Sequence, residues 1–348
     1  MAKSSAKPAK QDIMPAGKKR ATSYDVAQLA GVSQSAVSRC FKSGASVSAK
    51  MRARVLKAAK ELGYQPNAIA RGLITRRSNI VAVIMAEFTH LNYPEVLSHL
   101  NRRLADRGIH ILLFTLGRES DVDTVLDQVW QYQVDGVIAA ARFTPEQIDA
   151  CEQRDIPLIF YNRVYEDSTV SAVCCDHAEG ERQLVGGLLK NGRRSFVVVS
   201  GPPDSAVSMA RTGGAVDRLK EAGVSYHVVT GDYTYDSGCQ AVHQVMSEDR
   251  GVPDAFVCAN DVMAIGCIDT LRNDYNLQVP KSVAVVGFDG VGAADWLSYD
   301  LTTIVQPVER MVGASISMLL ERIETPDIPA EKRLFAGQLR QGASAKLA

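Results

Sequence analysis

Residues 22–42 read TSYDVAQLAGVSQSAVSRCFK, two short helical patterns separated by little more than a glycine and a valine. Thr22 or Ser23 can cap the first helix and Ser33 the second, because a hydroxyl at these positions accepts a hydrogen bond from the first turn. A helix this short buries little by itself, so the polar side of the second one needs another partner. The expected inward positions are Val26, Leu29 and Ala30 in the first helix and Ala36, Val37 and Cys40 in the second.

A third helix is predicted after Ser48 and before Gly63. Three short helices, with a glycine-containing turn between the first two, form a helix-turn-helix unit. We therefore expect an all-α domain over residues 21–64. The apolar stripe of its third helix consists of Met51, Val55, Leu56, Ala59 and Leu62.

Charge is distributed unevenly along the 348 residues, although Lys+Arg and Asp+Glu each number 39. Residues 1–78 contain 16 basic and 3 acidic side chains, whereas residues 79–348 contain 23 and 36. A basic head on an acidic body indicates a polyanionic partner for the head alone. Residues 1–20 are predicted to form a disordered basic arm.

The segment YQPNAIARGLITRRS at 64–78 follows the third helix. Pro66 suits the first position of a helix, and residues 67–73 could form about two turns. Such a helix is marginal alone, because nucleation is costly below about 12–15 residues. Residues 65–78 are therefore expected to be a hinge helix and linker whose order depends on a partner.

From residue 79 onward, apolar strand-like runs alternate with amphipathic helical stretches, a pattern typical of doubly wound parallel sheets. This length is large for one sheet, so two α/β lobes are expected, with a ligand in the crevice at the carboxyl ends of the strands. The expected strands are 80–85, 109–114, 136–140, 157–161, 196–200, 255–258, 283–287 and 334–339, and the expected helices are 93–107, 121–131, 178–190, 215–222 and 262–272.

Several classes of protein are disfavoured by what the sequence does not contain. The first twenty residues have no apolar signal-peptide core, and the apolar runs are far shorter than the ~20 residues of a membrane helix. Seven cysteines without a CxxC pair suit a reducing cytosol, and Cys174 and Cys175 are expected to be packing residues. The six histidines show no metal-ligand spacing, and HAEGE at 177–181 is not followed by the PCxxC of zinc deaminases. We predict a cytoplasmic protein with no metal and no cofactor.

The chain resembles the LacI/GalR family of transcriptional regulators from about residue 22 to residue 340. The motifs that carry the resemblance are YDVAQLAGVSQSAVSR, VSAKMRARVLKAAKELGYQPNAIARGL, VDGVI, IPLIFYNR, CANDVMAIGCIDTLR, VPKSVAVVGFDG and LTTIVQPVERM. Each is weak alone, but their order and spacing together are specific. The resemblance implies an N-terminal all-α helix-turn-helix head and a two-lobed α/β effector domain of periplasmic-binding-protein-like (type I) fold. It also implies crossovers between the lobes and, usually, a homodimer.

The expected domain limits follow from both lines of reasoning. The effector-binding and dimerisation domain is placed at 79–348. Its N-lobe is expected at about 79–162 plus 305–325, and its C-lobe at about 163–304 plus 326–342.

In a helix-turn-helix unit, residues at the start of the second helix meet base edges in the major groove. Gln34, Ser35 and Arg39 are in that position, and Gln can pair with adenine and Arg with guanine. Ala36 is a candidate for a thymine methyl group. Tyr24, Ser33, Ser38 and Ser48 are better placed for phosphates, although each serine could simply be a cap or a solvated hydroxyl.

The resemblance places a hinge helix at Pro66, Asn67, Ala70 and Arg71, and a minor-groove wedge at Leu73. A wedge costs a few kcal/mol of unstacking, which the contacts allowed by the bend offset. By itself, Leu73 could equally be a residue that packs against a lobe. Two protomers would recognise a pseudo-palindromic operator in double-stranded DNA.

The crevice is expected to take a small polar effector such as a sugar or a sugar acid. By resemblance, effector groups meet Asn162, Arg163, Arg211, Asn260 and Asp289, whose amide, carboxylate and guanidinium groups suit hydroxyls and acids. Asp261 and Asp176 could merely be helix caps. Tyr93 and Tyr233 could stack on a sugar face, and Gln306 is a weaker candidate on an expected crossover.

Three other functions were weighed against an effector-controlled repressor. A sugar-transport binding protein predicts a signal peptide and no DNA-binding head. An enzyme is disfavoured because no GxGxxG follows a strand and no Walker or GxSxG motif is present. An activator with the same architecture stays open, as do the identity of the effector and whether it induces or co-represses. No leucine heptad follows the last strand, which predicts a dimer without a coiled-coil tail.

Overall fold

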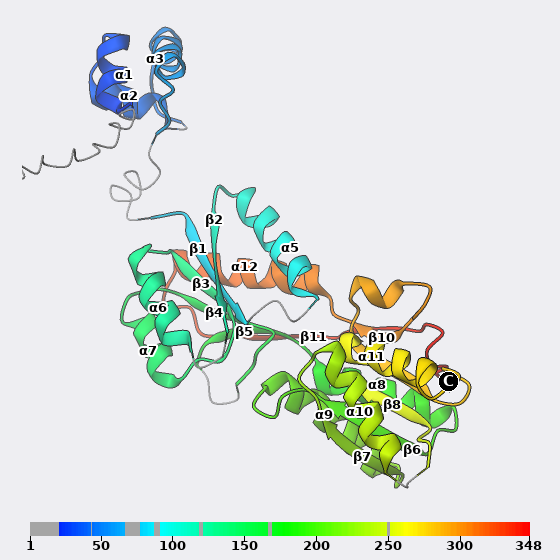
Figure 1. Ribbon diagram of the computed structural model, residues 1–348. Coiled ribbons are helices and arrows are strands. Elements are labelled where there is room, and N and C mark those ends of the chain that lie inside the picture. The colour runs from blue at the N-terminus through cyan, green and yellow to red at the C-terminus, as the bar shows by residue number, and fades with distance from the viewer. Residues whose placement is uncertain are drawn as a thin grey trace, which may run out of the picture. The chain divides into compact units, whose positions relative to one another are not determined.

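The computed structural model describes residues 21–42, 44–66, 77–86, 91–117, 121–165, 169–248 and 251–348. The chain forms two compact units, Met1–Ser78 and Asn79–Ala348, which Figure 1 shows in blue and in cyan to red. The predicted arm at 1–20 and most of the predicted hinge helix lie outside the described residues. No helix among the described residues is long and apolar enough to cross a membrane.

The head consists of α1 (Ser23–Ala30), α2 (Gln34–Cys40) and α3 (Ala49–Leu62), each with its expected cap. Thr22, Ser33 and Ser48 accept backbone hydrogen bonds in the first turns of these helices. Gly31 ends α1 with φ = 61°, a conformation that favours glycine and allows the sharp turn into α2.

The core of the head is narrower than the sequence pattern predicts. Leu29, Leu56 and Leu62 were expected to face inward, but all three are exposed. Ala27 and Ala58 are buried instead, because three short helices enclose only a thin stripe of side chains. The hydrophobic cluster of the head consists of Val26, Ala27, Ala30, Val37, Cys40, Val55, Ala58 and Ala59, with Phe41 and Tyr64 in edge-to-face contact beside it.

The larger unit contains two six-stranded sheets, as expected for two α/β lobes. The first sheet has the order β11-β5-β4-β3-β1-β2, and all its neighbouring strands are parallel. Its strands are β1 (Ile80–Ala86), β2 (His110–Leu116), β3 (Gly136–Ala140), β4 (Leu158–Tyr161), β5 (Ser171–Cys175) and β11 (Lys332–Phe335).

The second sheet has the order β12-β10-β9-β8-β6-β7 and is parallel except for β12, which pairs antiparallel with β10. Its strands are β6 (Ser195–Ser200), β7 (Ser225–Thr230), β8 (Ala255–Cys258), β9 (Ala284–Asp289), β10 (Thr302–Val305) and β12 (Gln338–Arg340).

Helices connect the strands and cover the sheets of both lobes (Figure 1). The first lobe carries α5 (Tyr93–Ala105), α6 (Val122–Gln131), α7 (Pro145–Glu152) and α12 (Val308–Glu324). The second lobe carries α8 (His177–Lys190), α9 (Ala206–Glu221), α10 (Tyr235–Ser247), α11 (Asp261–Asn273) and the 3-10 turn η2 (Gly292–Asp295).

Two of the expected lobe limits differ from the observed pairing. The sequence assigned residues 163–304 to the C-lobe, but β5 pairs with β4 in the first sheet. The chain therefore crosses to the second lobe after Cys175. The predicted single strand 334–339 is in fact β11 in the first sheet and β12 in the second, with a crossover between them. Alternating apolar residues continue through this crossover, so the sequence pattern alone does not reveal it.

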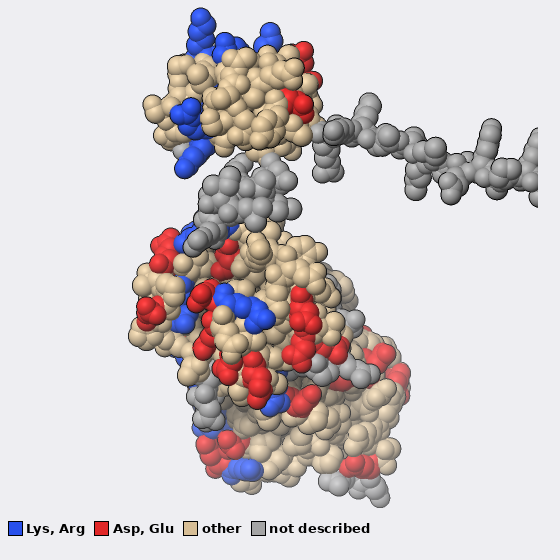
Figure 2. Space-filling view, turned by 90° about the vertical axis from the view of Figure 1, so that its left-hand side faces the viewer, with Lys and Arg blue, Asp and Glu red and all other residues tan. Residues whose placement is uncertain are grey.

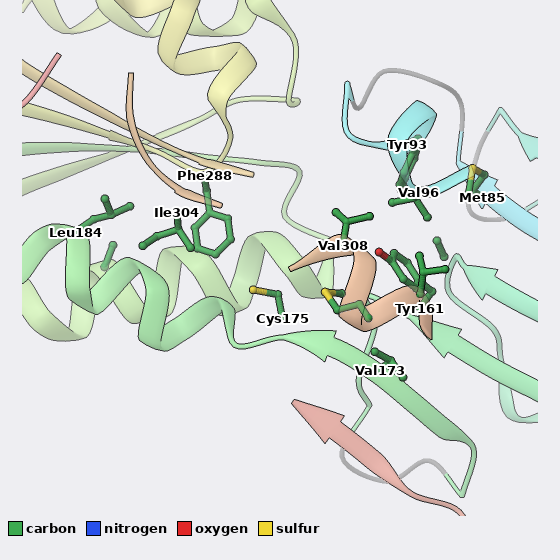
Figure 3. Close-up of a cluster of buried hydrophobic side chains, with 14 of the residues drawn as sticks. Met85, Tyr93, Val96, Tyr161, Val173, Cys175, Leu184, Phe288, Ile304 and Val308 are labelled. Atoms are coloured by element: carbon green, nitrogen blue, oxygen red, sulfur yellow. The ribbon is translucent and has the colours of Figure 1, made fainter. Parts of the chain in front are cut away.

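One hydrophobic cluster continues from one lobe into the other. Leu184, Phe288 and Ile304 lie in the second lobe, and Figure 3 shows them on one side of Cys175 and Val308. Tyr93 and other side chains of the first lobe lie on the opposite side. Because Cys175 and Val308 border two of the crossovers, the packed core passes through the hinge between the lobes. Close-packed side chains of this kind transmit strain rather than absorb it.

Candidate functional sites

The exposed face of α2 carries the polar side chains that the sequence analysis assigned to DNA. Gln34, Ser35, Ser38 and Arg39 are exposed, whereas Val37 and Cys40 are buried against the other helices. The amide nitrogen of Gln34 donates to Ser23 Oγ over 3.3 Å, which steadies Gln34 at the start of the helix. Figure 2 shows basic side chains distributed over the head. This surface has the charge and the hydrogen-bonding groups to approach a nucleic-acid groove.

The serines on this surface have structural partners of their own. Ser33 Oγ accepts from Ala36 N and Ser48 Oγ accepts from Met51 N, both over 3.3 Å. Capping and phosphate binding are compatible, since a hydroxyl has two lone pairs and a proton. Ala36 is only 4 % exposed, so the head offers little of that methyl group to a thymine. Tyr24 is exposed, and Asn67, Ala70 and Leu73 lie outside the described residues.

In the larger unit, a small cavity lies at the carboxyl ends of the strands, between the lobes. It holds about 20 Å³, which is room for about one water molecule. Six of the eight predicted effector residues line it. The lining residues are Asn92, Tyr93, Asn162, Arg163, Ser205, Val207, Arg211, Tyr233 and Asp289.

Arg211 is the centre of a buried hydrogen-bond network around this cavity. Its Nη2 donates to Asp289 Oδ1 over 2.7 Å, and its Nη1 donates to the carbonyl of Ala259 over 2.5 Å. The guanidinium also lies over the ring of Phe288, 3.9 Å from the centroid. Burial alone would lower the pKa of Arg211, but the charge and hydrogen bond of Asp289, together with Tyr233 and Glu181, offset this and raise the pKa above its ordinary value.

The third guanidinium nitrogen of Arg211, Nε, determines which ring nitrogen of His177 carries the proton. Arg211 Nε donates to His177 Nδ1 over 3.2 Å, so Nδ1 is an acceptor and the imidazole carries its proton on Nε2. His177 Nε2 lies 3.0 Å from Asn162 Oδ1, to which it then donates. Burial, followed by the charges of Arg211 and Arg163, lowers the pKa of His177 well below its ordinary value. A neutral histidine therefore joins β4 of the first lobe to α9 of the second.

Two predicted residues stand behind the cavity rather than in its wall. Gln306 donates from Nε2 to Asp289 Oδ1 over 2.7 Å, on the crossover after β10. Asn260 caps α11 by accepting from Met263 N and donates to the carbonyl of Tyr233 over 3.0 Å. Both residues hold cavity residues in position.

The two aspartates with alternative interpretations have structural roles. Asp176 caps α8 by accepting from Glu179 N over 3.1 Å. Asp261 is the first residue of α11, and its carboxylate accepts from Gly290 N, Val291 N and Thr303 Oγ1. The cap of α11 is Asn260, so the suggestion that Asp261 is the cap was wrong; it holds the loop after β9 instead.

Three residues of the cavity wall have a backbone conformation that side-chain-bearing residues seldom adopt. The φ angles of Asn162, Tyr233 and Asp289 are 55°, 70° and 123°. Such conformations cost about 1–3 kcal/mol each and cluster at binding and catalytic sites. Gly201 leaves the space for the ring of Tyr233, since a Cβ there would lie 2.3 Å from that ring.

Sequence reasoning missed several residues of this site. His177 was considered only within the rejected zinc motif, and its place after the cap of α8 was the available signal. Asn92 lines the cavity at the start of α5, and its buried Oδ1 has no hydrogen-bond partner among the described residues. Ser205 caps α9 and Val207 lies in its first turn, because this helix begins at Ala206 rather than at the predicted residue 215.

The described residues contain no group of three or more His, Cys, Asp or Glu side chains that could hold a metal ion. The cavity wall offers the buried Arg211–Asp289 pair, a second arginine (Arg163), two side-chain amides and a serine hydroxyl beside two tyrosines. This set can bind a polar molecule through directed hydrogen bonds.

Comparisons with known proteins place the two units in one family. The family model "Bacterial regulatory proteins, lacI family" matches residues 22–67, and "Periplasmic binding proteins and sugar binding domain of LacI family" matches residues 78–333. The chain therefore belongs to the LacI family of bacterial transcriptional regulators, which confirms the resemblance seen in its motifs.

Individual relatives are similar in sequence to this protein along most of its chain. The HTH-type transcriptional regulator CelR of Thermobifida fusca is 31% identical and the ribose operon repressor of Escherichia coli K12 is 29% identical. The matches cover 88% and 93% of this chain, and 93% and 100% of the relatives.

Solved structures give the same result. The lac repressor dimer bound to operator and the anti-inducer ONPF has a TM-score of 0.85 at 25% identity, covering 94% of this chain and 99% of that one. A complex of the transcriptional regulator CelR with cellobiose has a TM-score of 0.71 at 28% identity, covering 94% and 100%. The helix-turn-helix head and the type I periplasmic-binding-like body are thereby confirmed.

Proposed function

We propose that this regulator is a dimeric repressor whose affinity for a pseudo-palindromic operator is set by a small polyhydroxylated effector bound between its lobes. The observation that carries the proposal is the buried Arg211–Asp289 pair, which lines a cavity at the interlobe crevice of a chain with a DNA-reading head. The repressors and the cellobiose complex among its relatives support this choice.

On DNA, the exposed side of α2 enters the major groove. Gln34 and Arg39 read base edges, while the hydroxyls of Ser33 and Ser48 contact phosphates. Leu73 wedges into the minor groove at the centre of the operator. Replacing Leu73 with Ala should then weaken specific binding far more than binding to random DNA, and equal losses would eliminate the wedge. Because its DNA partner is the bacterial chromosome, we place the protein in the cytosol.

The effector meets a wall that is rich in hydrogen-bonding groups and carries two arginines and one aspartate. Asp289 accepts from hydroxyls, and the side-chain nitrogen of Asn162, whose oxygen already accepts from His177, donates to them. The buried Oδ1 of Asn92, which has no partner among the described residues, accepts from one more hydroxyl. Tyr93 and Tyr233 supply aromatic surface for the apolar face of a sugar ring. A pentose or hexose does not fit into about 20 Å³, so the effector binds a more open arrangement of the lobes.

This requirement supplies the regulatory mechanism. The effector stabilises one arrangement of the lobes and the operator stabilises another, so each ligand changes the affinity for the other. The changes are reciprocal and typically about 5–150-fold. The lobes move about the three crossovers, which follow Cys175, Val305 and Phe335.

Dimer formation buries an exposed apolar patch of the second lobe. Trp296 is 63 % exposed and Leu297 is fully exposed, directly after η2. A second copy of this chain is the occupant that a twofold-symmetric operator requires. Changing Leu297 to Asp should shift the protein from dimer to monomer in light scattering without loss of the folded state. A variant that stays dimeric would place the interface elsewhere.

The experiment that tests the proposed function is a thermal-stability screen of the purified protein with pentoses, hexoses, disaccharides, sugar acids and nucleosides. A ligand of the folded state stabilises it by RT ln(1 + [L]/Kd). We expect one group of related polyhydroxylated compounds to raise the melting temperature of the wild-type protein. The same compounds should leave the Arg211→Ala variant unchanged, and a screen without any stabilising compound would contradict the proposal.

A further inference from the structure

Glu181 is buried in the second lobe without a hydrogen-bond partner. It lies on α8, one turn after His177, and is 1 % exposed. Neither of its carboxyl oxygens has a partner among the described residues. An ionised carboxylate in this position would lose its hydration without compensation. Burial therefore raises the pKa of Glu181 to about 8, and at neutral pH the side chain holds its proton.

Two of the charged groups that act on Glu181, Arg211 and Asp289, line the effector cavity. Arg211 on α9 favours ionisation of Glu181, whereas Asp289 at the end of β9 and Asp261 at the start of α11 oppose it. The interaction is mutual, since the charge of Glu181 raises the pKa of Arg211. Among the other titratable groups nearby, His177 on α8 itself is neutral, and the Cys258 thiol on β8 is buried with Cys267 in the cluster on the opposite face of the sheet. Arg340 on β12 is bound to Asp295.

Helices α8 and α9 approach each other closely at Ala178 and Gly214, which lie one turn from Glu181 and from Arg211 respectively. A Cβ added at Gly214 on α9 would lie 2.3 Å from the carbonyl oxygen of Ala178 on α8. On the sheet side, a Cβ at Gly180 would lie 2.7 Å from the ring of Phe288, over which Arg211 is stacked. Glu181 lies one turn after His177, which accepts from Arg211 Nε over 3.2 Å, so a charge on Glu181 would arise close to a guanidinium that already binds Asp289.

We propose that Glu181 is a positioning residue for Arg211: the neutral acid leaves Arg211 on Asp289, and the carboxylate draws the guanidinium towards α8. The effector site then has two arrangements that differ by one proton, released from the Glu181 carboxyl to solvent. In the second arrangement Asp289 keeps Gln306 but loses part of its bond to Arg211. The inference rests on the proposed function only in regarding this network as the effector site.

The test follows Arg211 directly, in the full-length protein without DNA or effector. The Nε–H resonance of Arg211, assigned with the Arg211→Lys variant, is followed by NMR between about pH 6 and pH 10 together with the Glu carboxyl carbons. In the wild-type protein, we expect the Arg211 signal and one Glu carboxyl signal to shift with a common midpoint near pH 8.

Two variants make the result decisive. Glu181→Gln cannot ionise and should hold the Arg211 signal at its low-pH position throughout, whereas Glu179→Gln, at an exposed position on the same helix, should retain the wild-type shift. The inference is overturned if Arg211 still titrates in Glu181→Gln. In the wild-type protein alone, the inference is also overturned if the Glu181 carboxyl signal titrates while the Arg211 Nε–H signal does not shift. Since neither DNA nor sugar is present, failure here leaves operator and effector binding to their own tests.

Discussion

Arg211 Nη2 and Asp289 Oδ1 are 2.7 Å apart, in a pair that joins α9 to the end of β9 and is closed off from solvent on both sides. Every nitrogen of this guanidinium has a partner, and Asp289 also accepts from Gln306 on the crossover between the lobes. The effector site is thus connected to the hinge through one carboxylate.

The first prediction concerns this pair. Arg211→Ala leaves a carboxylate buried without its partner, which costs about 3–5 kcal/mol of unfolding free energy. The double variant Arg211→Ala/Asp289→Ala should recover much of that loss, because the uncompensated charge is gone. Urea denaturation measures both. The matched control is Arg218→Ala on the same helix, where a partly exposed ion pair should cost less than about 1 kcal/mol. Additive losses at Arg211 and Asp289 would mean that the pair is not coupled.

The second prediction concerns sequence reading by the head. Gln34→Ala should relax base preference at one symmetric pair of operator positions, with a loss of about 1–3 kcal/mol of discrimination. Lys57→Ala, at an exposed position on α3, should instead weaken binding to all sequences and lower the salt dependence. Selection from a random DNA library reads both effects. An unchanged preference in Gln34→Ala would leave this residue without a role in recognition.

The third prediction concerns pH. The folded-state pKa of Glu181 is about 8, above its ordinary value of 4.5, so between these values the folded protein binds more protons than the unfolded chain. Its contribution to stability is complete below about pH 4.5 and is lost as the pH rises towards 8, at up to about 1.4 kcal/mol per pH unit. The difference in unfolding free energy between wild type and Glu181→Gln should follow this slope. Because His177 and Asp261 are present in both proteins, their own pH-dependent contributions to the unfolding free energy cancel in this difference.

A flat difference across this range would show that Glu181 is ionised in the folded protein. His177 provides the internal contrast, because its pKa is lowered and its contribution is lost as the pH falls. The two groups can therefore be separated by the sign of the slope, since the Glu181 contribution is lost as the pH rises and the His177 contribution as the pH falls.

The fourth prediction uses two adjacent glycines of α9. A Cβ at Gly213 meets nothing within 4 Å, so Gly213→Ala should stabilise the protein by about 0.5–1 kcal/mol through helix propensity. A Cβ at Gly214 would lie 2.3 Å from Ala178 O, so Gly214→Ala should destabilise it by forcing α8 and α9 apart. Thermal unfolding gives the sign of each change. The same sign for both variants would contradict the described helix packing.

The sequence predicted the fold well where local patterns decide it. Hydroxyl caps and glycines marked the three helices of the head, and continuous apolar runs marked most central strands of both sheets, although β5 and β10 were not predicted. The runs at 136–140 and 255–258 match β3 and β8. The edge strand β7 was missed, because its mostly exposed residues do not form a continuous apolar run.

The site was harder to predict, because it is built from long-range contacts. Arg211 and Asp289 were named from the family resemblance, yet nothing in their local sequence indicates that they pair with each other. His177 and Glu181 are ordinary polar residues of an amphipathic helix until the packing of α8 against α9 and β9 buries them. The lobe limits failed for a similar reason, since the crossovers at Asp176 and Gly337 have no distinctive composition.

The central claim is tested most directly by selecting operators for the purified full-length protein from random double-stranded DNA, then titrating the winner with the sugars that stabilise the protein. The account predicts enrichment of a pseudo-palindrome and a change of about 5–150-fold in its affinity with one class of sugar. It would be contradicted by a protein that prefers no palindrome to scrambled DNA, whether or not those sugars are present.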